Sequence, residues 1–345
     1  MDKRIPVTVL TGDFHAGKTV LRNRILAEDR ARRYALLVDA GQADAVELAA
    51  TGIAGQFIVR TKEELFEMNS GCICCTIRGD LIRALHVLLE EESGNFDAVI
   101  IETAGSADPG PIIQTFFVDH ILEQHTGLDS VIAVVDADTI VQELQGNRAA
   151  MQQIAFADQV VPANTEALDG AALEALQARL RRINPLALIQ QARPADIALE
   201  ALLDRGAFEL ERGAALAGDF AMPPQVAGKT DDNEISAVLL EADVAMEFDR
   251  VDEWLAGLVM RQGTDLLRGK GVIDVIDRGG DRRRLAFQSV QMLHEGNFPR
   301  TWAADEPHAS RLVFVGRNLD LEALQTGFMA CAASGAATFA LVSAA

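Results

Sequence analysis

Two short motifs near the start of the chain combine residue types that could bind phosphate and a metal ion. The first, Gly12-Asp13-Phe14-His15-Ala16-Gly17-Lys18-Thr19, follows an apolar run at residues 7–10 and precedes a helical pattern. The second, Gly71-Cys72-Ile73-Cys74-Cys75, contains three of the four cysteines of the chain. A phosphate loop and a thiol cluster in one domain would allow nucleotide hydrolysis to be coupled to metal handling.

The spacing Gly-x-x-x-x-Gly-Lys-Thr is typical of a loop that cradles phosphates, in which backbone amides point inward around an anion at a helix start. Lys18 would place its charge on the β- and γ-phosphates, and Thr19 its hydroxyl on Mg²⁺. Asp13 and His15 are unusual in such a loop and predict a reduced nucleotide affinity. A structural glycine turn is the alternative. The candidate nucleotide-binding residues of the loop are Gly12, His15, Ala16, Gly17, Lys18 and Thr19.

An acidic residue, Glu102, ends a later apolar strand and is followed by a turn of small residues up to Gly105. A carboxylate in this position can hold Mg²⁺ through water. Gly105 would let a backbone amide approach the γ-phosphate, so that the loss of this phosphate could be sensed. We therefore predict that Lys18 and Glu102 are catalytic and that Thr19 and Glu102 hold Mg²⁺. The alternative is an ordinary acidic residue at the end of a strand.

The cysteine cluster predicts a transition-metal site. Thiolates of Cys72 and Cys74 can reach one ion from a tight turn, and Cys75 can supply a third or an adjacent ligand. Soft thiolate ligands select Zn²⁺, Cu(I) or, less strongly, Co²⁺. Three protein ligands leave one position open, which suits a transferable ion. Buried apolar cysteines and a thiol redox pair are the alternatives.

The elements that must position these residues follow the pattern of an α/β domain with a parallel sheet, because short apolar runs alternate with helical patterns. Several runs lack polar alternation, as expected of strands buried on both faces. We place this domain at residues 1–190, followed by an extension and linker at 191–233. Strands are predicted at residues 6–11, 35–39, 56–60, 98–102, 130–135, 158–161 and 187–190.

A smaller α+β domain is predicted at residues 234–345, with strands at 235–241, 271–276, 284–291, 311–316 and 337–342 and helices at 251–261 and 321–333. The strands at 271–276 and 284–291 are expected to form an antiparallel pair. Cys331 lies on an apolar helical face and is predicted to belong to the core.

Composition and charge argue against several classes of function. The chain has 345 residues, 49% of them apolar, and a net charge of −20 from 31 basic and 51 acidic residues. Such a surface repels nucleic-acid backbones and anionic membranes, so neither is expected as a partner. No apolar stretch approaches the roughly 18 residues of a membrane span, and no signal peptide is evident. We expect a cytoplasmic protein.

Residues 12–19, 67–81 and 102–109 resemble the CobW-like GTPases, as do residues 266–271, 287–290 and 311–317 of the second domain. The resemblance covers nearly the whole chain. It implies a P-loop NTPase domain followed by a CobW C-terminal domain that is a candidate for partner binding. It further implies a GTP-hydrolysing metallochaperone that uses Mg²⁺, binds Zn²⁺ or Co²⁺ at Cys72, Cys74 and Cys75, and delivers the ion to a client metalloprotein or to cobalamin synthesis.

Two segments depart from that family. Ala163-Asn164-Thr165-Glu166 stands where these GTPases have the guanine-reading Asn-Lys-x-Asp. Glu166 keeps a carboxylate for the base on a longer side chain, and Asn164 replaces the lysine. Guanine selectivity is therefore expected to be weaker, and the preference for GTP over ATP is left open. Residues 39–42 lack the glutamate of the acidic Asn-Glu-Phe-Gly segment. Asp39, Asp44 and Glu47 are candidates to replace it.

Other functions remain open on this sequence. A degenerate relative that binds metal or a partner but barely hydrolyses nucleotide would explain Asp13, His15 and the altered base loop. A thiol redox protein would explain the cysteines alone. The six histidines are scattered and are expected to be structural or solvated, with His86, on the helix after the cysteines, the one most worth following. Client and physiological metal are not predicted, and a homo-oligomer is left open.

Overall fold

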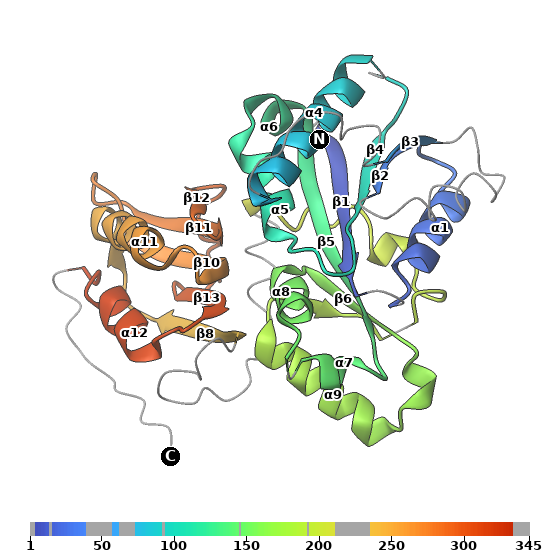
Figure 1. The fold of residues 1–345 in the computed structure, drawn as a ribbon. Coiled ribbons are helices and arrows are strands. Elements are labelled where there is room, and N and C mark those ends of the chain that lie inside the picture. Colours follow the sequence, from blue (N-terminus) through green and yellow to red (C-terminus); the bar gives the residue numbers. More distant parts are fainter. Residues whose placement is uncertain are drawn as a thin grey trace. The chain divides into compact units, whose positions relative to one another are not determined.

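The computed structural model describes residues 4–13, 16–38, 57–61, 73–91, 94–144, 146–191, 193–210 and 235–333. The chain divides into two compact units, residues 1–212 and 213–345. Each unit has its own sheet (Figure 1).

The first unit is built on a seven-stranded sheet with the order β3-β2-β4-β1-β5-β6-β7, in which every neighbouring pair is parallel. The predicted α/β fold is therefore confirmed. All seven predicted strands exist and differ from prediction only at their ends. They are β1 (Ile5–Gly12), β2 (Tyr34–Val38), β3 (Phe57–Thr61), β4 (Ala98–Glu102), β5 (Thr126–Asp136), β6 (Gln159–Ala163) and β7 (Leu188–Ile189).

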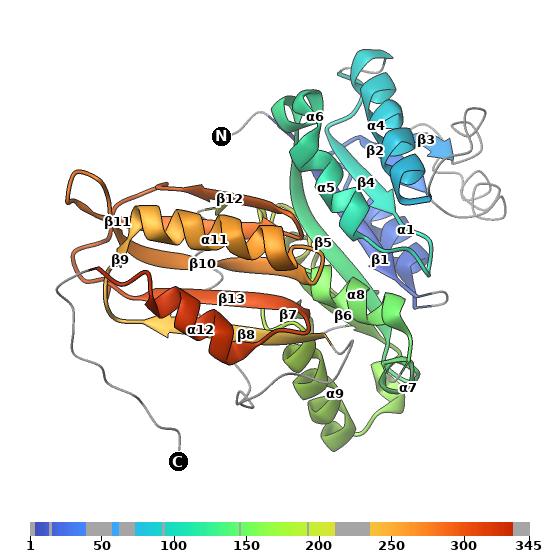
Figure 2. The same ribbon diagram turned by 60° about the vertical axis from the view of Figure 1, so that its left-hand side comes forward.

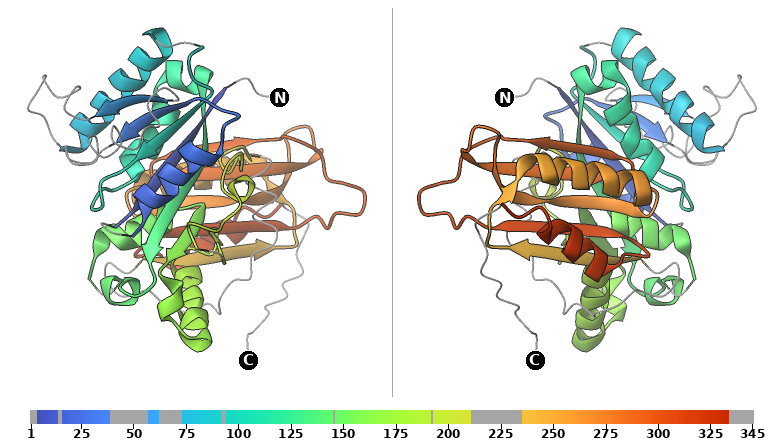
Figure 3. Two further views of the ribbon diagram at one scale, coloured as in Figure 1. Left: turned by 90° about the vertical axis from the view of Figure 1, so that its right-hand side faces the viewer. Right: turned by 90° about the vertical axis from the view of Figure 1, so that its left-hand side faces the viewer.

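Helices cover both faces of this sheet, with α1 on one face and α4 and α5 on the other (Figure 3). Burial on both faces explains why β2 and β4 are apolar at nearly every position. The helices of this unit are α1 (Lys18–Glu28), α4 (Ile73–Glu91), α5 (Gly110–Val118), α6 (His120–His125), α7 (Ile140–Glu143), α8 (Arg148–Phe156) and α9 (Gly170–Ile183), with short 3-10 turns η1 (Thr165–Ala167) and η2 (Leu199–Ala201).

Part of the segment expected to be an extension belongs to the core of the first unit. Ile197, Leu202 and Leu203 are buried and pack in one cluster with Leu21 and Ile25 of α1. These apolar residues are few and irregularly spaced, so they give no periodic signal in the sequence. The rest of the expected linker, residues 211–233, lies outside the described residues.

Asp129, inside β5, fastens this same segment to the sheet. It is 6% exposed, and its Oδ1 accepts a hydrogen bond of 2.7 Å from the backbone amide of Gly206. Burial raises the pKa of Asp129 to about 6, the charges of Asp204 and Asp158 add to this, and the hydrogen bond from Gly206 only partly offsets it. The sheet therefore contains a carboxylate whose ionisation opposes folding.

Replacing Asp129 with asparagine is expected to stabilise the protein at neutral pH by about 1–3 kcal/mol, since the side-chain amide keeps an acceptor oxygen for Gly206 without the charge. Because folding raises the pKa of Asp129, the protonated carboxyl contributes to the stability of the folded state. This contribution is fully present below about pH 4 and is lost as the pH rises through about 6. The gain should therefore be larger at pH 8 than at pH 5. Urea denaturation at both pH values checks this, and an equal gain at both would contradict it.

The second unit is a six-stranded sheet with the order β12-β11-β10-β13-β8, to which β9 adds by pairing with β10. Both helices contribute to its core and lie on one face (Figure 2). The predicted antiparallel pair is confirmed as β10 and β11. β9 and β12 were not predicted, and the strand expected at 337–342 lies outside the described residues. The elements are β8 (Ile235–Ala242), β9 (Met246–Glu247), α11 (Phe248–Gln262), β10 (Leu266–Ile276), β11 (Arg282–Val290), β12 (Leu293–Asn297), β13 (Ser310–Arg317) and α12 (Leu321–Met329).

Aromatic packing holds α11 and α12 on this sheet. The ring of Trp254 in α11 contacts those of Phe314 and Phe328. A Cβ at Gly327 would lie 2.4 Å from Nε1 of Trp254, so only glycine allows this approach. Cys331 is 3% exposed within the same core, as predicted, although it follows the end of α12. Burial raises the pKa of its thiol to about 11, which makes it a poor metal ligand at neutral pH.

Candidate nucleotide and metal site

The predicted phosphate loop connects the end of β1 to the start of α1. Gly12 has a φ of 137°, and a Cβ there would lie 2.0 Å from the carbonyl oxygen of Val134 in the neighbouring strand β5. Gly17, directly before α1, has a φ of 96°. Both glycines of the motif therefore occupy backbone conformations that other residues rarely adopt. His15, a candidate ligand of the nucleotide, lies outside the described residues.

Lys18 is the first residue of α1, and its side chain folds back over the loop. Its Nζ donates hydrogen bonds to the carbonyl oxygens of Gly12 (2.6 Å) and Asp13 (2.7 Å). The side chain is 8% exposed, so its charge is held close to the loop backbone. The positive charge and the amino end of α1 act at the same place, and both favour an anion.

Parallel pairing of β1 and β4 brings the predicted magnesium residues together. Leu10 of β1 is in register with Glu102 of β4, so the two strands end at the same edge of the sheet. Thr19 Oγ1 donates a hydrogen bond to Glu102 Oε1 at 3.3 Å, and Glu102 is 2% exposed. A hydroxyl and a carboxylate are the oxygen donors that Mg²⁺ prefers, so the pair fits the predicted ion. Arg22 Nη1 lies 2.6 Å from Glu102 Oε2, which the sequence did not suggest.

The turn after Glu102 is held by two glutamines of α8. Gln153 is 2% exposed, and its Nε2 donates to the carbonyl oxygens of Gly105 (2.9 Å) and Ala107 (3.2 Å). The neighbouring Gln152 donates to Asp108 Oδ2 at 2.8 Å. These glutamines were missed in the sequence. The only sequence feature that could have indicated their burial is their position in a helix, directly before the apolar residues 154–156.

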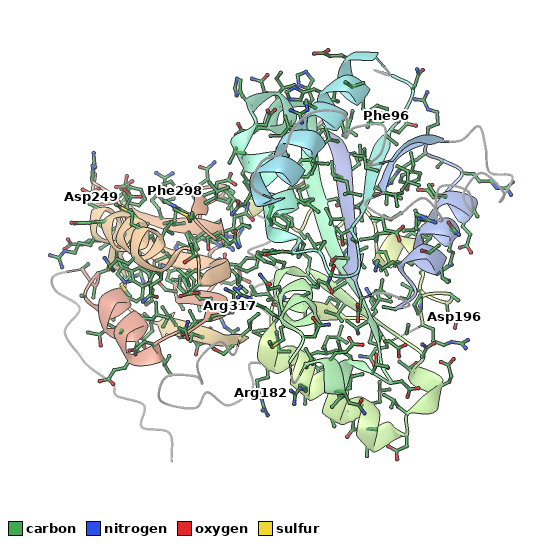
Figure 4. All side chains as sticks on the ribbon, in the orientation of Figure 1. Phe96, Arg182, Asp196, Asp249, Phe298 and Arg317 are labelled. Atoms are coloured by element: carbon green, nitrogen blue, oxygen red, sulfur yellow. The ribbon has the colours of Figure 1, made fainter. Side chains whose placement is uncertain are left out.

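The predicted base loop lies at the same edge of the sheet. Asn164 directly follows β6 with a φ of 55°, and its Nδ2 donates to Asp136 Oδ2 at 3.0 Å. Glu166, in the turn η1, is exposed. The loop adjoins the phosphate loop, since a Cβ on Gly17 would lie 3.8 Å from Cβ of Ala163. The opposite, amino edge of the sheet is marked by Phe96, just before β4 (Figure 4).

Most of the predicted metal site, the cysteine cluster, lies outside the described residues. Cys72 and residues 39–56 are not among them, and Cys74 and Cys75 are described only as backbone in the first turn of α4. Within the described part of the chain, no three His, Cys, Asp or Glu residues are grouped as a metal site would require. Cys72, Cys74 and Cys75 therefore remain predicted ligands. Across the same described ranges, no helix is long and apolar enough to span a membrane.

His86, on α4, contacts a residue from another helix. Its Nε2 lies 2.9 Å from Asp119 Oδ1, and Asp119 caps the amino end of α6 by accepting from the amides of Ile121 and Leu122. Burial raises the pKa of Asp119, but the hydrogen bonds from His86 and the two amides outweigh it and lower that pKa. His86 thus links α4 to the start of α6.

The two units match two families in chain order. The CobW/HypB/UreG nucleotide-binding domain model matches residues 6–191, and the model of the cobalamin synthesis protein cobW C-terminal domain matches residues 235–332. The chain is 34% identical to the zinc chaperone YjiA of Escherichia coli K12 over 328 residues, which cover 94% of this chain and 98% of YjiA. It is 28% identical to the zinc chaperone CobW of a Sinorhizobium species, covering 91% and 93%.

The fold is shared with a solved structure. The crystal structure of Zn(II)-bound YjiA GTPase from Escherichia coli superposes with a TM-score of 0.75 at 28% identity, covering 95% of this chain and 99% of YjiA. The comparison therefore extends over both units and not only over the phosphate-loop domain.

Proposed function

We propose that this chain, which belongs to the CobW family of nucleotide-binding proteins, is a GTPase that serves as a zinc metallochaperone in the cytoplasm. Two relatives that align along most of their length are named zinc chaperones, and a related solved structure is that of a Zn(II)-bound GTPase. The observation that carries the proposal is the convergence of Lys18, Thr19 and Glu102 at the carboxyl ends of β1 and β4.

The cargo, Zn²⁺ or Co²⁺, would bind Cys72, Cys74 and Cys75 and pass to a client metalloprotein or to an enzyme of a metal-dependent pathway. We assign nucleotide and metal binding to residues 1–190, and partner binding to residues 234–345, with residues 191–233 between them. Thiolates suit such a cargo because they bind these ions and leave a position open for the acceptor.

Different residues of the site would bind the triphosphate and the magnesium ion during hydrolysis. The loop amides and Lys18 would orient the triphosphate and neutralise its charge, and Thr19 and Glu102 would hold Mg²⁺. When bound, Mg²⁺ supplies further neutralisation of the charge that develops on the phosphates. The amide of Gly105 would contact the γ-phosphate, while Gln153 holds the carbonyl of the same residue in place.

A path from nucleotide to metal follows from the packing. The turn that contains Gly105 runs directly into α5, which begins at Gly110, and α4 packs against α5. The cysteine motif overlaps the first turn of α4. Release of the γ-phosphate would free the turn, and a shift of α5 against α4 would change the geometry of the thiolates. This arrangement supports a two-state element that both ligands bias.

The base loop supports a weaker preference for guanine than a complete Asn-Lys-x-Asp loop would give. Glu166 retains a carboxylate for the two donors of guanine, whereas Asn164 is engaged with Asp136. We expect GTP to bind about 10- to 100-fold more tightly than ATP, well below the roughly 10⁴ or more of sites with complete hydrogen-bond readout. Glu166→Asp should raise this preference by restoring the shorter arm.

Isothermal titration of GTP, ATP and GDP into Mg²⁺-loaded protein, with and without Zn²⁺, tests this proposal together with a turnover assay. Equal affinities for GTP and ATP would contradict the role of Glu166. Tight nucleotide binding without turnover would favour the second candidate, a weakly hydrolysing metal-binding relative, which Asp13 in the loop supports. A disulfide that reforms among the three cysteines on mild oxidation, detected by thiol counting, would favour a redox protein.

A further inference from the structure

A buried arginine contacts the carboxylate that we assign to Mg²⁺. Arg22, in the second turn of α1, is fully buried, and its Nη1 lies 2.6 Å from Glu102 Oε2. Its Nε and Nη2 both donate to Asn23 Oδ1 at 3.1 Å. The other carboxylate oxygen, Oε1, accepts the hydroxyl of Thr19. Glu102 is thus held at both oxygens by residues of one helix.

The electrostatic consequence follows from burial. An ionised carboxylate out of water costs a large free energy unless a cation or several hydrogen bonds compensate it. In a magnesium site whose buried carboxylate has no cationic side chain beside it, Mg²⁺ itself is the compensating charge. The carboxylate then takes its binding orientation only when the ion is present. Here the guanidinium supplies that charge permanently: Nε and Nη2 are held by Asn23, and Nη1 is thereby directed at one oxygen of the carboxylate.

We infer that Arg22 is a positioning residue of the magnesium site, a built-in counter-ion that keeps Glu102 directed at Thr19 with or without Mg²⁺ and makes nucleotide binding less dependent on Mg²⁺. The inference rests on the proposed function, since it takes Glu102 as a magnesium residue. A pair that only anchors α1 to β4 would affect stability alone. A counter-ion also sets how much Mg²⁺ adds to nucleotide affinity.

The test measures the Kd of a non-hydrolysable GTP analogue with excess Mg²⁺ and with EDTA, in zinc-free protein. Arg22→Met, which leaves Glu102 without its cation, should increase the ratio of the EDTA value to the Mg²⁺ value by about tenfold or more. Arg22→Lys, which keeps the charge, should restore most of the wild-type ratio. Arg33→Met is the matched control, because Arg33 pairs with Asp97 at the amino edge of the sheet, away from the site.

Two further measurements keep the inference falsifiable. If Arg22→Met does not fold, the double variant Arg22→Met/Glu102→Gln should fold, because it leaves no unpaired charge. The inference is then tested on Arg22→Met itself, whose fold added Mg²⁺ should restore, because the ion replaces the missing positive charge beside Glu102. A fold that Mg²⁺ does not restore, or an unchanged ratio in folded Arg22→Met, would reduce the pair to a structural anchor and overturn the inference.

A failure of the proposed function gives a different result. If the wild type binds no GTP analogue, the proposal of a GTPase fails, and the melting temperature then decides the role of Arg22. Mg²⁺ alone should raise the melting temperature of Arg22→Met by more than that of the wild type, since only the variant has an uncompensated carboxylate. An equal rise in the two proteins, or no rise in the variant, would overturn the inference independently of nucleotide binding.

Discussion

Replacement of Lys18 with alanine is expected to lower kcat/KM for GTP hydrolysis by about 10²- to 10³-fold, the usual cost of removing one preorganised charge from a transition state. The ammonium is held over the loop by the carbonyls of Gly12 and Asp13, so it is already in place when the phosphates arrive. A steady-state assay of phosphate release at saturating Mg²⁺ measures the effect.

The matched control is Arg24→Ala. Arg24 lies on the same helix and pairs with Glu28 near the surface, so its loss should leave turnover within a few-fold of wild type. Circular dichroism of both variants separates loss of catalysis from loss of fold. Turnover that survives in Lys18→Ala would show that hydrolysis occurs elsewhere or belongs to a contaminant, and the assignment of this loop would fail.

Replacement of Gly12 with alanine is expected to destabilise the first unit by about 3 kcal/mol or more. The new Cβ would lie 2.0 Å from the carbonyl oxygen and 3.0 Å from the carbonyl carbon of Val134, both backbone atoms of the central sheet that cannot move aside. The φ of 137° adds strain. Urea denaturation followed by a probe specific to the first unit measures the loss.

Gly17→Ala is the matched control for this prediction. Its φ of 96° is also unfavourable for alanine, but its Cβ would meet side-chain atoms only at 3.8 and 3.9 Å, which is ordinary contact. It should cost about 1–2 kcal/mol, from strain alone. Equal losses in the two variants would contradict the account, because the difference between them is the backbone clash at Gly12.

The sequence predicted those parts of the site that local pattern encodes. The phosphate loop follows a strand, β1, and Glu102 ends another, β4. Because β1 and β4 are parallel neighbours, their carboxyl ends lie at the same edge of the sheet, and the two motifs come together there. Burial on both faces made the central strands visible as apolar runs. β12 was missed since Leu293–Asn297 is largely exposed and contains polar residues and a glycine.

The contacts that were missed join residues far apart in the sequence. Arg22 and Glu102 are separated by 80 positions, and Gln153 and Gly105 by 48. Nothing local distinguishes a buried arginine in α1 from the solvated ones, because its partner is known only once β1 and β4 are paired. The packing of Ile197 and Leu202 against α1 was missed for the same reason. Site residues fixed by tertiary contacts therefore need the fold.

The assignment of the three clustered cysteines as metal ligands stays a prediction from the sequence. Cys72 lies outside the described residues, and the side chains of Cys74 and Cys75 are not described. The packing of α4 on α5 supplies a physical reason for nucleotide and metal to influence each other. Coupling of this kind must be reciprocal, so that each ligand changes the affinity for the other by the same factor.

The most direct test is the Zn²⁺ affinity of the full chain, measured by competition with a chromophoric chelator, in the presence of a non-hydrolysable GTP analogue and of GDP. We predict Kd values that differ by about fivefold or more between the two nucleotides. Replacement of Cys72, Cys74 and Cys75 with serine should abolish both the binding and the difference. Equal Zn²⁺ affinity in the two nucleotide states, or tight binding that survives the loss of all three thiols, would contradict nucleotide-gated metal transfer.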